Sequence, residues 1–307
     1  MTTAIHNQEL LSKSTQYSKF ESINKHTWCS GCGNYGIISA LKRALTLENI
    51  APHKALLCYD VGCSGNESDK INCYTIHGLH GRVLPLASGL SIANSDSKVS
   101  PVIAMAGDGA TLSEGINHLV HTIRNNYNLT FILHNNSIYG LTIGQASSTT
   151  HLGQHASGTV AGVSVPELNV LDFVLSCNPT FVARAFASDV DHLTSIIQEG
   201  INHQGFSFIE VYQACPTFNK ATPQEWFWDK LVNVQDLKTY DNSDIKQARE
   251  IVQDMENRLA VGVIYRDNNR KDFLTTQKNK TPELNLPLFQ DSKIPELNIL
   301  LNEFRLF

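Results

Sequence analysis

The sequence predicts an α/β protein built on a parallel β-sheet with helices on both faces. Three observations carry this prediction. Strand-like and helix-like segments alternate from residue 33 to residue 213, which is the pattern of repeated βα units. Several strand-like segments are short, continuous apolar runs, as expected for parallel strands buried on both faces. The chain has 307 residues and is 42% hydrophobic, which is enough for a packed core.

Helical spacing of apolar residues predicts a first helix over 33–45, where Ile37, Ile38, Leu41 and Leu45 share one face. A second helix is predicted over 82–94, with Pro85 early enough to be tolerated. The same reasoning predicts three more helices, over 113–126, 165–177 and 189–200. Apolar runs predict the intervening strands, over 54–62, 99–109, 129–136, 180–187 and 206–213.

Three regions follow from this pattern. Residues 1–24 are expected to form an N-terminal arm, and residues 25–215 a domain that carries the ligand site. Residues 216–307 are expected to form a C-terminal extension that wraps the core or a partner, beginning with a loop over 216–230. Within the domain, the Gly-, Ser- and Thr-rich segment 137–162 is long for a loop, which is typical of functional or mobile segments.

The overall composition argues against several classes of protein. The net charge of −5 gives no basic signal for binding nucleic acid or an anionic membrane. The chain has no apolar run of about 18 residues, so no membrane span is expected. Its polar N-terminus lacks the apolar core of a secretory signal, which predicts a cytoplasmic protein. An odd number of cysteines, seven, argues against a disulfide framework.

A turn after the strand at 99–109 is a candidate phosphate site. Gly107, Asp108 and Gly109 stand between this strand and the next helix, and open α/β sheets bind ligands at the carboxyl ends of their strands. Glycines let the backbone approach a phosphate at a helix N-terminus. A carboxylate there repels phosphate unless a cation lies between them, and Mg²⁺ with its oxygen ligands fits this role.

Further magnesium ligands are expected at the end of the next strand. Asn136 follows Asp108 by 28 residues, which leaves room for one helix and one strand. The side-chain oxygen of Asn136 and the carbonyl of Ile138 can join Asp108 on one ion. Alone, the Gly-Asp-Gly motif is a weak signal and more often marks an ordinary Asp-Gly turn. Together with Asn136, it resembles the thiamine diphosphate signature, in which an asparagine follows Gly-Asp-Gly at about this distance.

The pair Cys29 and Cys32 can hold a metal, form a redox disulfide or bind an iron–sulfur cluster. A structural zinc site usually has a second C-x-x-C pair, and this sequence has none. The remaining cysteines outside the candidate sites are expected to be small buried hydrophobic residues: Cys58, Cys73 and Cys177.

Several longer motifs resemble one family, the β subunits of the 2-oxoacid:ferredoxin oxidoreductases. They are, in chain order, TWCSGCGN, VGCSGNE, LHGRVLPLASG, GDG, NNSIYGLTIGQAS and CPTFN, and the resemblance covers about residues 24–270. It implies a thiamine diphosphate-binding fold, with enzymes for 2-oxoglutarate and for broad ranges of 2-oxoacids as the nearest members.

The resemblance also implies residue roles. It assigns a [4Fe–4S] cluster to Cys29, Cys32, Cys63 and Cys215. It assigns contacts with thiamine diphosphate to a set of residues at strand ends and in the loops that follow: Val61, Gly62, Cys63, Ser64, His80, Gly107, Asp108, Gly109, Ala110, Gly140 and Leu141. The sequence departs from the family at three positions. Ala110 stands where an acidic residue is frequent, and Asn66 and Ile143 stand where basic residues occur.

The implied reaction is the coenzyme A-dependent oxidative decarboxylation of a 2-oxoacid, with 2-oxoglutarate favoured over pyruvate and electrons passed to ferredoxin. The glutamate that activates the thiamine ring comes from another chain in this family. A partner α subunit, or a fused γ–α subunit, is therefore expected in a heterodimer. Two alternatives are a non-redox thiamine diphosphate-dependent decarboxylase or lyase subunit, which needs no cysteine quartet, and a zinc-stapled binding protein, which needs no Gly-Asp-Gly and Asn pair.

Overall fold

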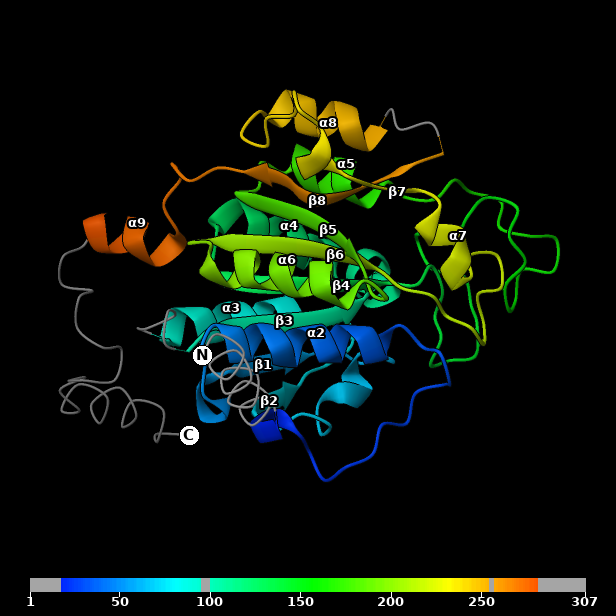
Figure 1. Ribbon diagram of the computed structural model, residues 1–307, viewed down its shortest axis with the longest axis horizontal. Coiled ribbons are helices and arrows are strands. Elements are labelled where there is room, and N and C mark those ends of the chain that lie inside the picture. The colour runs from blue at the N-terminus through cyan, green and yellow to red at the C-terminus, as the bar shows by residue number, and fades with distance from the viewer. Residues whose placement is uncertain (1–17, 95–99, 254–256, 281–307) are drawn as a thin grey trace, which may run out of the picture.

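A computed structural model describes residues 18–94, 100–253 and 257–280. Its centre is an eight-stranded sheet with the order β2-β1-β3-β4-β6-β5-β8-β7 (Figure 1). Every pairing is parallel except that between β5 and β8. The strands are β1 Leu56–Tyr59, β2 Tyr74–His77, β3 Val102–Gly107, β4 Leu129–Asn135, β5 Phe181–Phe186, β6 Phe206–Tyr212, β7 Leu231–Asn233 and β8 Leu259–Arg266.

Helices cover both faces of the sheet, and each face has its own apolar core. Helices α2 (Asn34–Leu47) and α6 (Val190–Asn202) pack with one face. The other face is covered by α3 (Val83–Ala93), α4 (Ile116–Asn125), α5 (Val170–Ser176) and α8 (Ile245–Gln253). Two further α-helices are α7 (Gln224–Trp228) and α9 (Phe273–Lys280). The predicted fold class, a largely parallel sheet between two layers of helices, is therefore confirmed.

Short helical turns complete the described chain. Four of them are 3₁₀ turns: η1 Ser18–Phe20, η2 Pro52–Lys54, η3 Gly65–Glu67 and η5 Val234–Asp236. The fifth, η4 (Gly109–Glu114), is a π-helical turn. Such turns are often found at functional sites, and this one lies directly after the Gly-Asp-Gly motif.

Two predicted helices begin later than expected. The helix predicted over 165–177 begins at Val170, because the side chain of Asn169 accepts a hydrogen bond from Asp172 N at 3.2 Å and caps the helix there. The helix predicted over 113–126 begins at Ile116, because the π-turn occupies the residues before it. It ends at Asn125, because the next residue, Asn126, has a left-handed φ of 54° that terminates the helix.

The sheet extends beyond the predicted strands at both edges. β2, an edge strand with mostly exposed side chains, pairs with β1. β8 and β7 lie at the other edge and come from the C-terminal third of the chain, so part of the segment expected as an extension belongs to the sheet. The segment expected as a loop over 216–230 contains the short helix α7. Of the expected arm and extension, residues 1–17 and 281–307 lie outside the described chain.

The described end of the arm is tied to the domain. Phe20 is buried, and its carbonyl accepts a hydrogen bond from Asn72 N at 2.9 Å. Among the helices that the structure describes, none is long and apolar enough to cross a membrane.

Candidate functional site

A cavity of about 530 Å³ opens at the carboxyl ends of the parallel strands. Loops that follow β1, β3, β4 and β6 line it, and these loops gather at one end of the molecule (Figure 1). Every residue that the sequence assigned to thiamine diphosphate or magnesium lines this cavity: Val61, Gly62, Cys63, Ser64, His80, Gly107, Asp108, Gly109, Ala110, Asn136, Ile138, Gly140 and Leu141. The fold therefore brings these scattered segments together.

The glycine turn after β3 is closely packed on one side. A Cβ at Gly109 would lie 2.3 Å from the ring of Tyr139, whereas a Cβ at Gly107 would meet no atom within 4 Å. Thr111 Oγ1 donates to the carbonyl of Gly107 at 2.8 Å and fixes the turn. Only a glycine fits at position 109 while Tyr139 keeps its place.

Asp108 is 2% exposed, and its carboxylate is held by two hydroxyl groups. Oδ2 accepts hydrogen bonds from Ser147 Oγ at 2.5 Å and from Thr149 Oγ1 at 2.7 Å. Burial raises the pKa of Asp108 to about 6, although the bonds from Ser147 and Thr149 act in the opposite direction. A bound divalent cation would remove this penalty, because it favours the charged carboxylate.

The other two proposed magnesium ligands present oxygen atoms to the same cavity. Asn136 Oδ1 accepts from Ile138 N at 3.0 Å, which fixes the amide in a tight turn. The carbonyl oxygen of Ile138 accepts no hydrogen bond among the described residues, so it is free to bind a cation. One carboxylate, one amide oxygen and one carbonyl form a donor set that suits Mg²⁺, with water and phosphate completing the octahedron.

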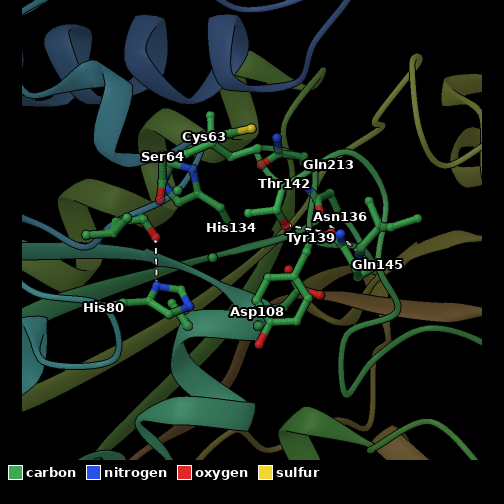
Figure 2. Close-up of a pocket in the computed structure, with 18 of the residues that line it drawn as sticks. Cys63, Ser64, His80, Asp108, His134, Asn136, Tyr139, Thr142, Gln145 and Gln213 are labelled. Carbon is green, nitrogen blue, oxygen red and sulfur yellow. Dashed lines mark hydrogen bonds between the residues drawn. The ribbon is translucent and has the colours of Figure 1, made fainter. Parts of the chain in front are cut away.

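His80 lies at the cavity wall and is oriented by the loop after β1. Its Nδ1 is 3.2 Å from Asp60 Oδ1 and 3.0 Å from the carbonyl of Val61. Figure 2 shows His80 at the cavity wall, with one hydrogen bond drawn from its ring. Asp60 is fully buried and also accepts from the backbone N–H groups of Gly81 and Val83. Because Nδ1 is engaged on this side, Nε2 is the atom of His80 that remains for a ligand.

The four cysteines assigned to a cluster come from segments that meet beside the cavity. A Cβ at Gly140 would lie 3.3 Å from Cys63 Sγ and 3.8 Å from Cys215 Sγ, so both sulfurs flank this glycine. Burial, together with the smaller effect of negative charge on Cys32, Cys215 and Cys29, raises the pKa of Cys63 to about 12. These three thiols are thus close enough to Cys63 to interact electrostatically. All seven cysteines are free thiols.

The loop that carries the first two cysteines is anchored to the rest of the site. Trp28 Nε1 donates to the carbonyl of Cys63 at 2.7 Å, and Gly33 N donates to the carbonyl of Ala214 at 3.2 Å. The residues next to Cys29 and Cys32 are thereby bonded to the segments that carry Cys63 and Cys215. Of the four, Cys63 alone also lines the cavity, so it joins the two candidate sites.

Comparison with known proteins gives the family. A model described as the thiamine pyrophosphate enzyme C-terminal TPP-binding domain matches residues 60–211, and one for the C-terminal part of the pyruvate ferredoxin oxidoreductase β subunit matches residues 215–280. The 2-oxoacid:ferredoxin oxidoreductase subunit beta of Saccharolobus solfataricus is 36% identical over 251 residues, which are 78% of this chain and 81% of that protein. The chain belongs to the 2-oxoacid:ferredoxin oxidoreductase β-subunit family.

Other members of this β-subunit family agree with the assignment. The 2-oxoglutarate oxidoreductase subunit KorB of Mycobacterium tuberculosis is 36% identical over 203 residues, which are 66% of this chain and 54% of that protein. A solved structure described as 2-oxoglutarate:ferredoxin oxidoreductase from Magnetococcus marinus, with 2-oxoglutarate, coenzyme A and succinyl-CoA bound, superimposes with a TM-score of 0.85. It is 29% identical and covers 93% of this chain and 95% of its own. The resemblance inferred from sequence is confirmed, and the comparisons favour the oxidoreductase over both alternatives.

The residues that the sequence assigned to metals are not grouped as a single-ion site. In residues 18–94, 100–253 and 257–280, no three His, Cys, Asp or Glu side chains are placed to hold one metal ion. The expected magnesium set contains only one such side chain, Asp108. The cysteines of a [4Fe–4S] cluster bind different iron atoms, so they need not converge on one point as the ligands of a single ion do.

Sequence reasoning missed several residues of the site and named two that lie elsewhere. Asp60, Ser147 and Thr149 were not singled out, although the Ser- and Thr-rich composition of 137–162 was a signal for the last two. Asn66 and Ile143, the positions of family departure, do not line the cavity. Ile143 is 68% exposed and has a φ of 71°, which is unusual for a β-branched residue.

Proposed function

We propose that this β subunit binds thiamine diphosphate with Mg²⁺ in the cavity and one [4Fe–4S] cluster beside it. With an α subunit, it catalyses the coenzyme A-dependent oxidative decarboxylation of a 2-oxoacid and passes the electrons to ferredoxin. The observation that carries the proposal is the position of Cys63. This residue lines the cavity and also belongs to the cysteine quartet, so an electron donor in the cavity lies next to the cluster.

The diphosphate end of the cavity is the turn after β3. Gly107, Asp108 and Gly109 present backbone at the start of a helical turn, and Asp108, Asn136 and Ile138 offer the oxygen ligands for magnesium. The hydroxyls of Ser147 and Thr149 hold the Asp108 carboxylate by Oδ2, which fixes its direction. When bound, thiamine diphosphate supplies the nucleophilic carbon that attacks the keto group and takes up the electrons released as CO₂ leaves.

The cluster end is built by the turn Cys29–Cys32, the loop after β1 and the segment after β6. Cys29, Cys32, Cys63 and Cys215 supply four thiolates, the number that a [4Fe–4S] cluster takes. Gly140 has no side chain between Cys63 and Cys215; a methyl group there would press on Cys63 Sγ at 3.3 Å and make an ordinary contact with Cys215 Sγ at 3.8 Å. Cys58, by contrast, is fully buried in β1 and has no thiol neighbour that perturbs its pKa, which burial raises to about 12.

The activating glutamate is expected from the partner. The described residues that line the cavity include two carboxylates, Asp108 and Glu114, and both belong to the turn at the diphosphate end. The thiamine ring lies at the other end of such a cofactor, so we assign its activation to neither of these carboxylates. The proposed assembly is a heterodimer in which an α chain supplies the missing half of the active site.

Of the 2-oxoacids, we favour 2-oxoglutarate, because relatives named KorB and the solved structure above carry that substrate in their names. The test compares this chain alone with the chain assembled with its α subunit. Both are supplied with 2-oxoglutarate or pyruvate, coenzyme A and a viologen acceptor without oxygen. Turnover that requires both chains and prefers 2-oxoglutarate supports the proposal. Turnover by the single chain would show that it supplies its own activating carboxylate.

A further inference from the structure

Buried polar side chains stand toward the ends of three neighbouring strands, β4, β6 and β5 (Figure 1). In each strand an apolar residue of one core is followed, two positions later and so on the same face, by a polar one. The three pairs are Leu133 and Asn135, Phe208 and Glu210, and Val182 and Arg184. Asn135, Glu210 and Arg184 are 4%, 1% and 5% exposed, so each needs a partner for its polar atoms.

The three side chains form a chain of hydrogen bonds across the sheet. Arg184 Nε and Asn135 Nδ2 each donate to Glu210 at 2.7 Å, the first to Oε2 and the second to Oε1. An ionised carboxylate only accepts hydrogen bonds, so Asn135 has to face Glu210 with its NH₂ group. Glu210 therefore fixes which way round the Asn135 amide lies, with the amide oxygen turned toward the loop after β4.

The oxygen of Asn135 holds the turn that carries two proposed magnesium ligands. Oδ1 accepts from Ser137 N at 3.2 Å, a bond in which an asparagine side chain closes a turn with the backbone two residues further on. Ser137 has a left-handed φ of 56°, a conformation that a residue other than glycine keeps where surrounding contacts hold it. Asn136 and Ile138 lie on either side of Ser137, so the direction of their oxygen atoms depends on this turn.

The same oxygen lies beside the group that holds the third proposed ligand. Thr149 Oγ1 is 2.9 Å from Asn135 Oδ1 and 2.7 Å from Asp108 Oδ2. A hydroxyl group has one hydrogen, so Thr149 donates to one of these oxygens at a time. Asn135 thus contacts both parts of the proposed magnesium site: the turn after β4 and the hydroxyl next to Asp108.

We propose that Glu210 is a positioning residue for magnesium binding, and that it acts by orienting the Asn135 amide. Neither Glu210 nor Asn135 lines the cavity, so both act on the ion through the residues in front of them. Residues that orient metal ligands in this way contribute about 10- to 100-fold to metal affinity. The inference rests on the proposed magnesium site, and it gives the buried pair of Glu210 and Arg184 a role beyond the packing of the sheet.

Glu210→Gln tests the orientation, because it keeps the shape of the side chain and turns one of its two acceptors into a donor. The new NH₂ group has to face either Arg184 or Asn135, and both present donors there. Leaving the charged Arg184 without an acceptor is the costlier choice, so Asn135 should turn round and offer its oxygen to position 210. Ser137 N then loses its acceptor. The Mg²⁺ concentration for half-maximal binding of thiamine diphosphate should rise by about 10- to 100-fold.

A compensating double variant, Asn135→Asp with Glu210→Gln, should reverse this effect. The amide oxygen at position 210 can accept from Arg184 Nε, while its NH₂ group donates to the carboxylate at position 135. The other oxygen of that carboxylate accepts from Ser137 N. Every bond of the chain is then restored at unchanged net charge, so the magnesium requirement should return close to that of the wild type.

Calorimetric titration of the full-length chain with thiamine diphosphate, at a series of Mg²⁺ concentrations, measures this requirement. Urea unfolding in EDTA shows separately whether each variant is folded. Glu199→Gln is the matched control, because Glu199 pairs with Arg266 away from the site, and this variant should bind like the wild type.

An unchanged magnesium requirement in a folded Glu210→Gln chain would overturn the inference. So would a folded double variant that binds as weakly as Glu210→Gln. If neither variant folds, the pair holds the core of the sheet rather than the turn, and the inference also fails. A wild-type chain that binds thiamine diphosphate equally well without magnesium would instead refute the proposed metal site.

Discussion

Replacing Asp108 with asparagine should raise the stability of the metal-free fold and weaken its binding of magnesium. Burial raises the pKa of this carboxyl to about 6 from its ordinary value of 3.8, despite the hydroxyl groups of Ser147 and Thr149. At about 1.4 kcal/mol for each unit of pKa, the ionised carboxylate lowers the free energy of unfolding of the metal-free chain by about 3 kcal/mol. Asparagine keeps the shape and an accepting oxygen without that charge.

The pH dependence has a definite sign. An acid whose pKa is raised on folding is destabilising only where it is ionised. Below pH 3.8, the carboxyl is protonated in both the folded and the unfolded chain, and it contributes nothing. The penalty develops as the pH rises from 3.8 to about 6, and it is complete above that. Metal-free wild type should therefore lose stability over this window relative to Asp108→Asn.

In contrast to its stability, the magnesium binding of the Asp108→Asn variant should be weaker than that of the wild type. Asp108 carries the only full negative charge in the proposed ligand set, and a charged hydrogen bond or ligand contact contributes about 1.5–3 kcal/mol. The affinity for thiamine diphosphate should fall by about 10- to 100-fold and no longer depend on Mg²⁺.

Two measurements on each protein check these expectations: urea unfolding in EDTA at pH 4 and pH 7, and calorimetric titration with thiamine diphosphate with and without Mg²⁺. Asp191→Asn is the control, because Asp191 is 82% exposed and pairs with Arg43 at the surface. If Asp108→Asn proves less stable than wild type at pH 7, the electrostatic reasoning is wrong. If it retains magnesium-dependent binding, the ion lies elsewhere.

Three further predictions follow from the same site. Asn136→Ala should weaken thiamine diphosphate binding less than Asp108→Asn does in the same titration, because a neutral amide contributes less charge; an equal or larger loss would refute this ranking. Gly109→Ala should abolish that binding and cost about 1–3 kcal/mol of stability, since its Cβ meets the Tyr139 ring, whereas Gly107→Ala should leave stability unchanged; equal unfolding midpoints would contradict the packing argument. Single alanine variants of the four proposed cluster ligands, Cys29, Cys32, Cys63 and Cys215, should lose iron, whereas alanine variants of the other three cysteines should keep it. Full iron content in a variant of one of the four would show that this cysteine is not a cluster ligand.

The central part of the fold could be predicted from local pattern. The helix predicted over 33–45 is observed at Asn34–Leu47, and the strand predicted over 129–136 at Leu129–Asn135, because both have long apolar patterns of a single period. The edge strand β2 could not be found this way. Its side chains are mostly exposed, so it lacks an apolar run, and its pairing with β1 is a tertiary contact.

The part of the candidate site that could be predicted from sequence is the turn after β3, where close packing around the backbone requires a glycine. Gly109 lies under a ring that excludes any side chain, and Asp108 stands in the same turn. Ser147 and Thr149 were not predictable, because their contact with Asp108 spans a long irregular loop whose path is set by tertiary structure. Asp60 was missed for a similar reason, since its role is to orient His80, which lies 20 residues further along the chain.

The measurement that bears most directly on the proposed function is the iron, sulfide, zinc and thiamine content of the full-length chain, purified without oxygen and incubated with thiamine diphosphate and Mg²⁺. We predict about four iron and four sulfide per chain, as a [4Fe–4S] cluster requires, together with bound thiamine diphosphate and no stoichiometric zinc. Zinc without sulfide would contradict the cluster formed by Cys29, Cys32, Cys63 and Cys215. Thiamine diphosphate bound to a chain that cannot take up iron would contradict the transfer of electrons from the cavity to that cluster.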